Sequence, residues 1–242
     1  MNPGDFAVLC AVALLVGMAK TGIHGAGMAA VPLLAAVFGG QRSAGMLLPV
    51  LVMADVFGVV YYHRHASWHH LKKLLPFASA GVVLGTVVGQ YINDEVFRLL
   101  MAIIIAASVV IMLWMERGHK EDVPAYPWFA ALMGLAGGFT SMVGNLAGSV
   151  MALYFLSMRL PKNNYIGTTA WFFLVINWFK VPFHVFAWHT INGHTLLAGV
   201  LTLPFIGIGA WLGVTIVKLI SESVYRLFII GITLLAAVYM ML

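Results

Sequence analysis

Ten apolar segments follow one another along this chain, five on each side of a polar stretch at residues 116–122. The first five cover residues 6–19, 26–39, 44–62, 74–92 and 96–115, and the second five cover 127–139, 146–158, 164–183, 196–217 and 224–242. As helices, the last three segments of each half are long enough to cross about 30 Å of hydrocarbon. The first two of each half contain only about 14 residues, which is too short to cross comfortably.

A glycine-rich interruption separates the two short segments in each half. The interruptions read KTGIHGAG at residues 20–27 and TSMVGNLAG at residues 140–148. In a membrane chain, interrupted segments at matching places in two halves point to the binding site of a transporter. Each pair of short segments is expected to form either a re-entrant hairpin or one long broken helix.

The second half of the chain repeats the first half in outline. This predicts one integrated membrane domain built from two repeats, residues 1–115 and 128–242, joined by a linker at 116–127. The repeated glycines have the spacing of close helix packing in membranes, and they also allow a homodimer seam. The matching positions lie 128 residues apart: Pro76 and Pro204, Gly81 and Gly209, Gly85 and Gly213, and the tetrapeptides VFRL at 96–99 and VYRL at 224–227.

The composition is that of an integral membrane protein. Hydrophobic residues make up 62% of the chain and charged residues only 9%, whereas soluble domains carry about 25% charged residues. The single cysteine, Cys10, excludes an intramolecular disulfide and a thiolate metal cluster. The sequence contains no nucleotide-binding loop, no His-Glu-x-x-His and no Gly-x-Ser-x-Gly pattern, so we expect no enzyme and no cofactor. We attribute the pI of about 9.4 to a basic cytoplasmic face rather than to nucleic-acid binding.

The basic residues decide between a hairpin and a broken span. If each short pair is a hairpin, nine basic residues share one face and only Arg42 and Arg98 lie on the other. If each short pair crosses once, the loop charges split five against six. The positive-inside rule therefore favours the hairpin, and with it an all-α fold of two inverted repeats, each a re-entrant hairpin plus three transmembrane helices. We expect a bacterial inner membrane protein with both termini in the periplasm and the linker in the cytoplasm.

The two hairpin tips are expected to meet near the membrane midplane, because irregular backbone is tolerated there only when protein or a water-filled cavity covers it. Helices that begin after each tip direct unpaired N–H groups toward this space, which suits an anion. Lys20 adds a charge, and intramembrane charges are functional candidates by default. The candidate substrate-binding residues are Lys20, Thr21, Gly22, His24, Gly25, Ser141, Gly144, Asn145, Thr168 and Asn177.

Asp55 is the one carboxylate that the pattern places within the membrane. It is a candidate proton or cation site, or else one half of a structural ion pair with Lys20 or Lys180. His24 is equally able to carry a proton near neutral pH or to pack as a neutral side chain. The four histidines at 63, 65, 69 and 70 lie among basic residues, which disfavours a metal site and favours a solvated cytoplasmic loop.

Parts of the second half resemble a known family. The stretch AALMGLAGGF at 130–139, continuing to ALYFL at 152–156, resembles the second-repeat opening of the TauE/SafE family, also called the sulfite exporter family. The stretch from LPK at 160–162 to FFLVIN at 172–177 resembles the segment that follows. The resemblance covers essentially the whole chain. It implies transport of sulfite, sulfoacetate or related organosulfonates, usually outward.

Three functional hypotheses follow from the sequence. The first is a secondary transporter that exports a small sulfur-containing anion by alternating access between the two repeats. The second is a proton-coupled importer of a small organic acid, with Asp55 and His24 as the coupling pair. The third is a membrane-embedded scaffold in which Lys20 and Asp55 merely pair.

Overall fold

The computed structural model describes residues 2–23, 26–97, 99, 100, 103, 104, 107, 127–221 and 224. The linker and most of the apolar segments 96–115 and 224–242 lie outside these residues. The described chain is helical throughout and contains no strand, which confirms the predicted class. Its helices are α1 (Pro3–Lys20), α2 (Ala26–Phe38), α3 (Gly40–Tyr62), η1 (His63–His65), α4 (Trp68–Tyr91), α6 (Pro127–Gly144), α7 (Ala147–Ser157), α8 (Lys162–Pro182), the π-helical turn η2 (Phe183–Ala187), α9 (Gly193–Leu201) and α10 (Leu203–Leu219).

The helix α1 is longer than the apolar pattern predicted, because polar residues extend it at its start. Asn2 and Asp5 form a capping box, and Pro3 occupies the first helical position, where its missing N–H is not needed. At 18 residues, α1 is one of four described helices that are long and apolar enough to cross a membrane. The expectation that the first segment is too short to span is therefore wrong for α1.

The apolar segment at 196–217 is not one helix. It is divided at Thr202 into α9 and α10, which are bent by 47° and together form a fifth candidate span among the described residues. The bend has a local cause, because Pro204 lacks the N–H that a continuous helix needs. Thr202 instead closes the last turn of α9 through its backbone N–H and its hydroxyl, both of which donate to the carbonyl of Gly199.

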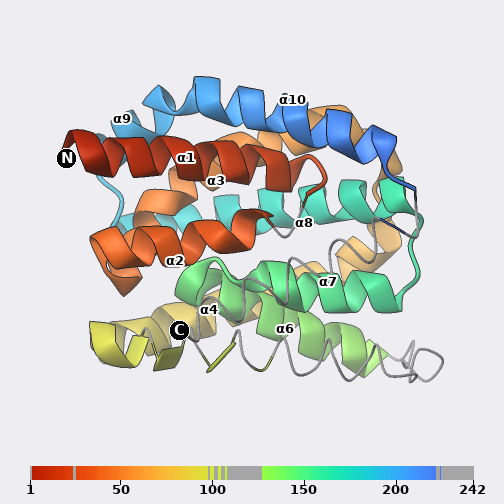
Figure 1. Cartoon of the computed structure of the whole chain (residues 1–242). Helices are drawn as coiled ribbons and strands as arrows, with labels where there is room; N and C mark the ends of the chain where they lie inside the picture. Colours follow the sequence, from red (N-terminus) through yellow and green to blue (C-terminus); the bar gives the residue numbers. More distant parts are fainter. Residues whose placement is uncertain are drawn as a thin grey trace.

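Each short pair forms an antiparallel hairpin. In Figure 1, the start of α1 and the end of α2 lie at the left of the molecule, and the start of α6 and the end of α7 lie at the right. The two hairpins thus open toward opposite ends of the molecule. Between them, α3 packs along α8 and forms the central seam.

Each hairpin packs against the long helix of the other half, and paired glycines make the contacts close. A Cβ at Gly81 of α4 would overlap the carbonyl oxygen of Leu135 in α6. A Cβ at Gly209 of α10 would overlap the carbonyl oxygen of Leu14 in α1. Gly81 and Gly209 are 128 residues apart, and their partners are 121 residues apart. The repeated glycines therefore serve one packing role twice within the chain.

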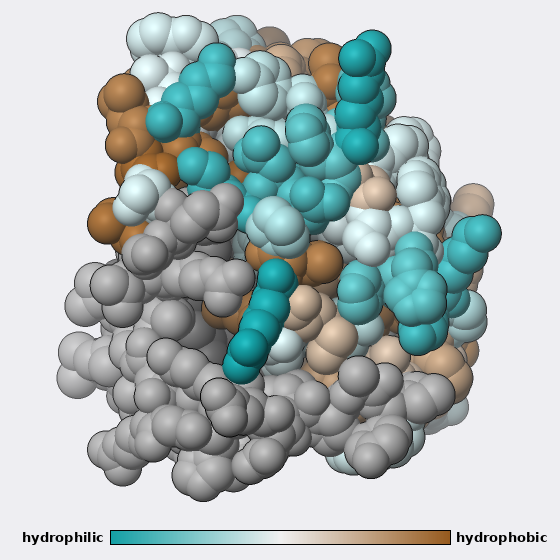
Figure 2. All heavy atoms as spheres, turned by 90° about the vertical axis from the view of Figure 1, so that its right-hand side faces the viewer, coloured by the Kyte–Doolittle hydropathy of each residue, from teal (hydrophilic) through white to brown (hydrophobic). Residues whose placement is uncertain are grey.

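The two ends of the molecule differ in charge. Figure 2 looks at the end where α3 and α10 finish and shows hydrophilic side chains spread over it. The exposed lysines and arginines at η1, at the start of α4 and at the ends of α7 and α10 are Arg64, Lys72, Lys73, Arg159 and Lys218. At the opposite end, where α1 and α3 begin and α4 ends, the described charged residues are Asp5, Arg42, Asp94 and Glu95.

We predict that Gly209→Ala destabilises the protein while Gly207→Ala does not. The added methyl of the first variant would press α10 away from α1, and overpacking of this kind costs about 1–3 kcal/mol. Gly207 lies on the same helix with nothing within 4 Å of a Cβ there, so it is a matched control. Thermal unfolding of both variants in detergent measures the difference. Equal melting temperatures would contradict the packing role of Gly209.

Candidate functional site

The candidate site lies where the two hairpin tips reach the α3–α8 seam. Lys20 is the last residue of α1, and Ser141 lies in the last turn of α6. Asp55 projects from α3, and Asn177 and Lys180 project from α8. The structure therefore brings together polar residues from four helices in an otherwise apolar interior.

Lys20 and Asp55 form a buried ion pair. The Lys20 Nζ lies 2.8 Å from Asp55 Oδ1, with 11% of the lysine side chain and 0% of the aspartate side chain exposed. The other carboxylate oxygen of Asp55 accepts a hydrogen bond of 2.6 Å from the Asn177 amide. The Lys20 ammonium also lies 4.0 Å from the centre of the Phe173 ring, a cation–π contact. Of the two partners that the sequence left open for Asp55, the structure selects Lys20.

Lys180 is fully buried and is held by neutral oxygens. Its Nζ donates to the backbone carbonyl and the hydroxyl of Ser141, both at 3.0 Å, and to the Asn145 side-chain carbonyl at 2.6 Å. These contacts use all three ammonium donors. The carbonyl of Ser141 lies at the C-terminal end of α6, where helix dipoles favour a cation. Among the described residues, no carboxylate forms an ion pair with Lys180.

Asn145 joins the second hairpin tip to both seam helices. Its backbone has φ of 58°, a left-handed conformation that asparagine tolerates better than most residues. The backbone N–H donates back to the Ser141 carbonyl at 3.0 Å, which closes the end of α6. The side-chain amide donates to the Ala44 carbonyl of α3 at 3.2 Å, while its oxygen accepts from Lys180. The conformation of this tip is thus tied to the lysine.

The formal charges in this network do not cancel. Two cations, Lys20 and Lys180, share the interior with one carboxylate, Asp55. Buried charges are costly unless they are paired, and the direct contacts of Lys180 are with neutral oxygens, while Asp55 pairs with Lys20. With all three side chains ionised, the network therefore carries one net positive charge.

Other predicted site residues are placed differently. The Thr21 hydroxyl donates to the Gly17 carbonyl and the Ala210 carbonyl, so it joins α1 to α10. The Thr168 hydroxyl donates to the Asn164 carbonyl and accepts from the Ser67 N–H, so it holds the chain before α4.

The remaining predicted residues belong to the backbone of the tips. Gly22 has φ of 145°, a conformation that favours glycine. It packs in the first tip against the side chain of Val217, which leaves no room for a Cβ. Gly144 is the last residue of α6. His24 and Gly25 lie outside the described residues.

Gly58 is a site residue that the sequence analysis missed. A Cβ at Gly58 would press on the backbone carbonyl of Lys20, so α3 and the first tip are in close contact there. Lys180 lies 122 positions after Gly58. It contacts the backbone carbonyl of Ser141 in the second tip, just as Gly58 contacts the backbone carbonyl of Lys20 in the first tip. The same spacing of 122 residues relates Asp55 to Asn177. This repeated spacing could have revealed from the sequence that Gly58 corresponds to Lys180.

The histidines near residues 63–70 do not converge. His63 contacts the Val60 carbonyl at 3.0 Å, whereas His70 contacts the Tyr154 hydroxyl at 3.0 Å. Within the described parts of the chain, no three His, Cys, Asp or Glu side chains are arranged to hold a metal ion.

The comparisons identify the family. A family model described as sulfite exporter TauE/SafE matches residues 9–240, nearly the whole chain. This chain therefore belongs to the TauE/SafE sulfite exporter family, whose members are membrane transporters and not enzymes. No curated protein and no solved structure matched the chain. The family and the apolar helices together define a multi-pass membrane transporter.

We predict that removing one partner of the Lys20–Asp55 pair destabilises the protein more than removing both. Lys20→Met or Asp55→Asn leaves the other charge buried and unpaired, which costs about 3–5 kcal/mol. The Lys20→Met/Asp55→Asn variant removes both charges and recovers much of this loss. Chemical unfolding of the three variants measures the coupling, with exposed Lys73→Met as the control. If the double variant is as unstable as the sum of the single variants, the two side chains are not coupled.

Proposed function

We propose that this protein exports a small sulfur-containing anion, such as sulfite or a short organosulfonate, and that the anion binds at Lys180 between the hairpin tips. The observation that carries the proposal is the fully buried Lys180, which has hydroxyl, amide and carbonyl neighbours but no described carboxylate partner. A buried cation whose neighbours are neutral attracts an anion that supplies the missing charge. The family description points to the same class of substrate.

Polar groups at the tip give the anion directional contacts. The Ser141 hydroxyl oxygen and the Asn145 side-chain oxygen both accept hydrogen bonds from Lys180, and the N–H₂ group of Asn145 lies on the same side chain. The α7 helix begins at Ala147, immediately after this tip, and its first N–H groups favour negative charge. Lys20 and Asn177 complete the surroundings through Asp55.

Binding is coupled to movement of the second hairpin. Because all three Lys180 donors are used, an anion has to replace at least one of the oxygens of Ser141 or Asn145. Losing the Asn145 contact frees a tip residue that also holds α3. Binding of the anion therefore replaces a contact between Lys180 and the tip with a contact between Lys180 and the anion. This provides a physical basis for alternating access.

The proposal includes two inverted repeats with six spans and two re-entrant hairpins. In it α1, although long enough to span, is one arm of the first hairpin, which returns through α2. The opposite directions of the two hairpins and the matched glycine contacts support it. The basic end, where α3 and α10 finish, is assigned to the cytoplasm of a bacterial inner membrane, and both termini to the periplasm.

The membrane potential supplies a driving force for export. An interior-negative potential favours outward movement of a monoanion by about 2.3 kcal/mol per 100 mV. Asp55 need not carry a proton for this, since it is already paired with Lys20.

We predict that Lys180→Met abolishes most sulfite binding and flux. A hydrogen bond to a charged group contributes about 1.5–3 kcal/mol, so affinity should fall roughly 10- to 100-fold. Potential-driven sulfite flux in proteoliposomes and thermal stabilisation by sulfite measure the two effects. Lys72→Met, at an exposed lysine, is the matched control.

The same experiment separates the alternatives. Unchanged sulfite flux in a folded Lys180→Met protein would overturn the assignment of the site. Flux of carboxylic acids that depends on a proton gradient would favour the proton-coupled importer. No flux or binding of any anion by the native protein would leave the scaffold hypothesis as the better account.

A further inference from the structure

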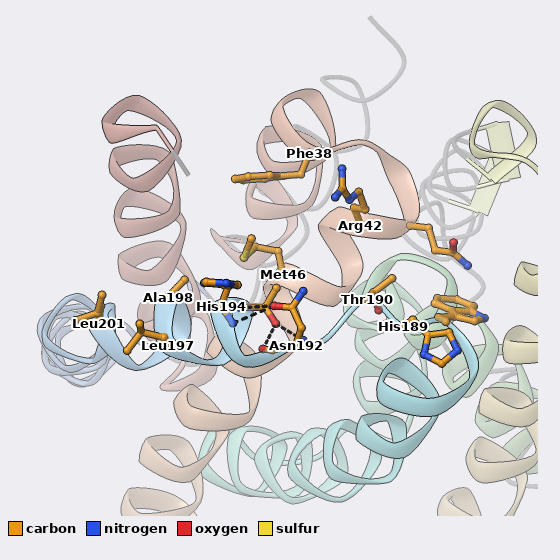
Figure 3. A pocket seen from close by; sticks show the side chains of 13 residues that line it. Phe38, Arg42, Met46, His189, Thr190, Asn192, His194, Leu197, Ala198 and Leu201 are labelled. Atoms are coloured by element: carbon orange, nitrogen blue, oxygen red, sulfur yellow. Dashed lines mark hydrogen bonds between the residues drawn. The ribbon is translucent and has the colours of Figure 1, made fainter.

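A pocket lies at the end of the molecule opposite the basic end. It has a volume of about 730 Å³ and lies between the end of α2, the start of α3 and the turn that leads into α9 (Figure 3). Pockets for small organic ligands have volumes of about 300–1,000 Å³. This pocket is therefore of the size that holds an organic molecule, and it is larger than a bare inorganic oxyanion requires.

The polar part of the pocket contains one fixed positive charge, Arg42. Arg42, His189 and His194 line it, and the lining includes no acidic side chain. Within the described chain, the Arg42 side chain makes no ion pair and no hydrogen bond. Asp94, an acid of the same end, accepts hydrogen bonds from the backbone N–H groups of Gly40 and Gln41 at 2.8 and 3.1 Å. It caps α3 and does not line the pocket.

The other part of the pocket is apolar. Leu197, Ala198 and Leu201 follow one another along α9, and Met46 of α3 faces them. In Figure 3 these side chains lie on one side of the pocket, and Thr190 and His189 lie on the other. A ligand that matches both parts carries a negative head and a short apolar group.

The turn that forms the polar wall is held in place by its own contacts. The Trp188 indole donates to the Thr86 carbonyl at 3.1 Å and packs edge-on against Phe97. His189 has φ of 52°, and the next residue, Thr190, donates its N–H to the His184 carbonyl at 2.9 Å. The wall is thus formed before any ligand enters.

The same turn connects the pocket with the central lysine. The Thr190 hydroxyl lies 2.8 Å from His184 Nδ1, and His184 lies one turn after Lys180. His184 is fully buried, and its Nε2 has no hydrogen-bond partner among the described residues. The buried His184 therefore lies in the sequence between Lys180 of the central site and Thr190 of the pocket wall.

We propose that this pocket is a second binding site, which takes a small organic monoanion with its charged head at Arg42 and its apolar group against α9. The inference rests on the proposed function for its role, which is to hold the exported anion before release at the outer face. It extends that function because the apolar side chains of α9 select anions by their apolar group.

The test is calorimetric titration of the full chain in phosphatidylcholine nanodiscs with methanesulfonate, propanesulfonate and butanesulfonate. We expect affinity to rise about fourfold for each added methylene buried against α9. Arg42→Gln should weaken binding at this site roughly tenfold, because a charge-assisted contact is lost. Arg64→Gln, an exposed arginine at the basic end, is the matched control. Leu197→Ala should make the affinity depend less on the length of the alkyl chain. The loss of affinity caused by Arg42→Gln should stay the same in this variant.

Each outcome decides the proposal. Titration in the Lys180→Met background isolates the outer pocket, so Arg42-dependent binding there supports it even if the central site is assigned wrongly. Equal affinities for native protein and Arg42→Gln, or no increase with chain length, would overturn it. Displacement of butanesulfonate by much lower concentrations of dihexanoyl phosphatidylglycerol would assign the pocket to a lipid headgroup and overturn its role in transport.

Discussion

The burial of three charged side chains in one apolar interior is the constraint on which the rest of this structure depends. Lys20, Asp55 and Lys180 lie where water is scarce, so each needs a partner from another helix. The hairpins meet this need, because their tips end at the α3–α8 seam and deliver Lys20 to one seam helix and the oxygens of Ser141 to the other. Close glycine contacts between each hairpin and the opposite half make that approach possible.

The two halves share a scaffold but divide the charges differently. In the first half, the tip carries the cation Lys20 and the seam helix carries Asp55, with Gly58 packed on the tip carbonyl. In the second half, the tip carries Ser141, and the seam helix carries Lys180 at the position that corresponds to Gly58. The first arrangement is internally neutral and therefore suits a structural role. The second leaves a positive charge beside neutral hydrogen-bond acceptors, and this asymmetry is the basis on which we propose anion binding in the second half.

The path that we propose for the anion follows the cationic side chains of the described part of the molecule. The basic end, the central lysine and the outer pocket each carry cationic side chains. The central site is polar and tightly bonded, whereas the outer pocket is larger and half apolar. In this proposal the central site selects the anion by its charge, and the outer pocket selects it by its apolar group.

The sequence by itself determined the membrane class, the family, and most helix positions, because composition and apolar segment length depend only on local order. It also placed Lys20 and Asp55 in the interior. It missed the extension of α1 by its Asn2 cap and the break of α9–α10 at Thr202, since both depend on a few polar atoms. Only the tertiary structure decided that Asp55 pairs with Lys20, leaving Lys180 to the second tip. These partners lie 35 and 39 residues apart in sequence, and helix packing, not local pattern, sets which atoms meet.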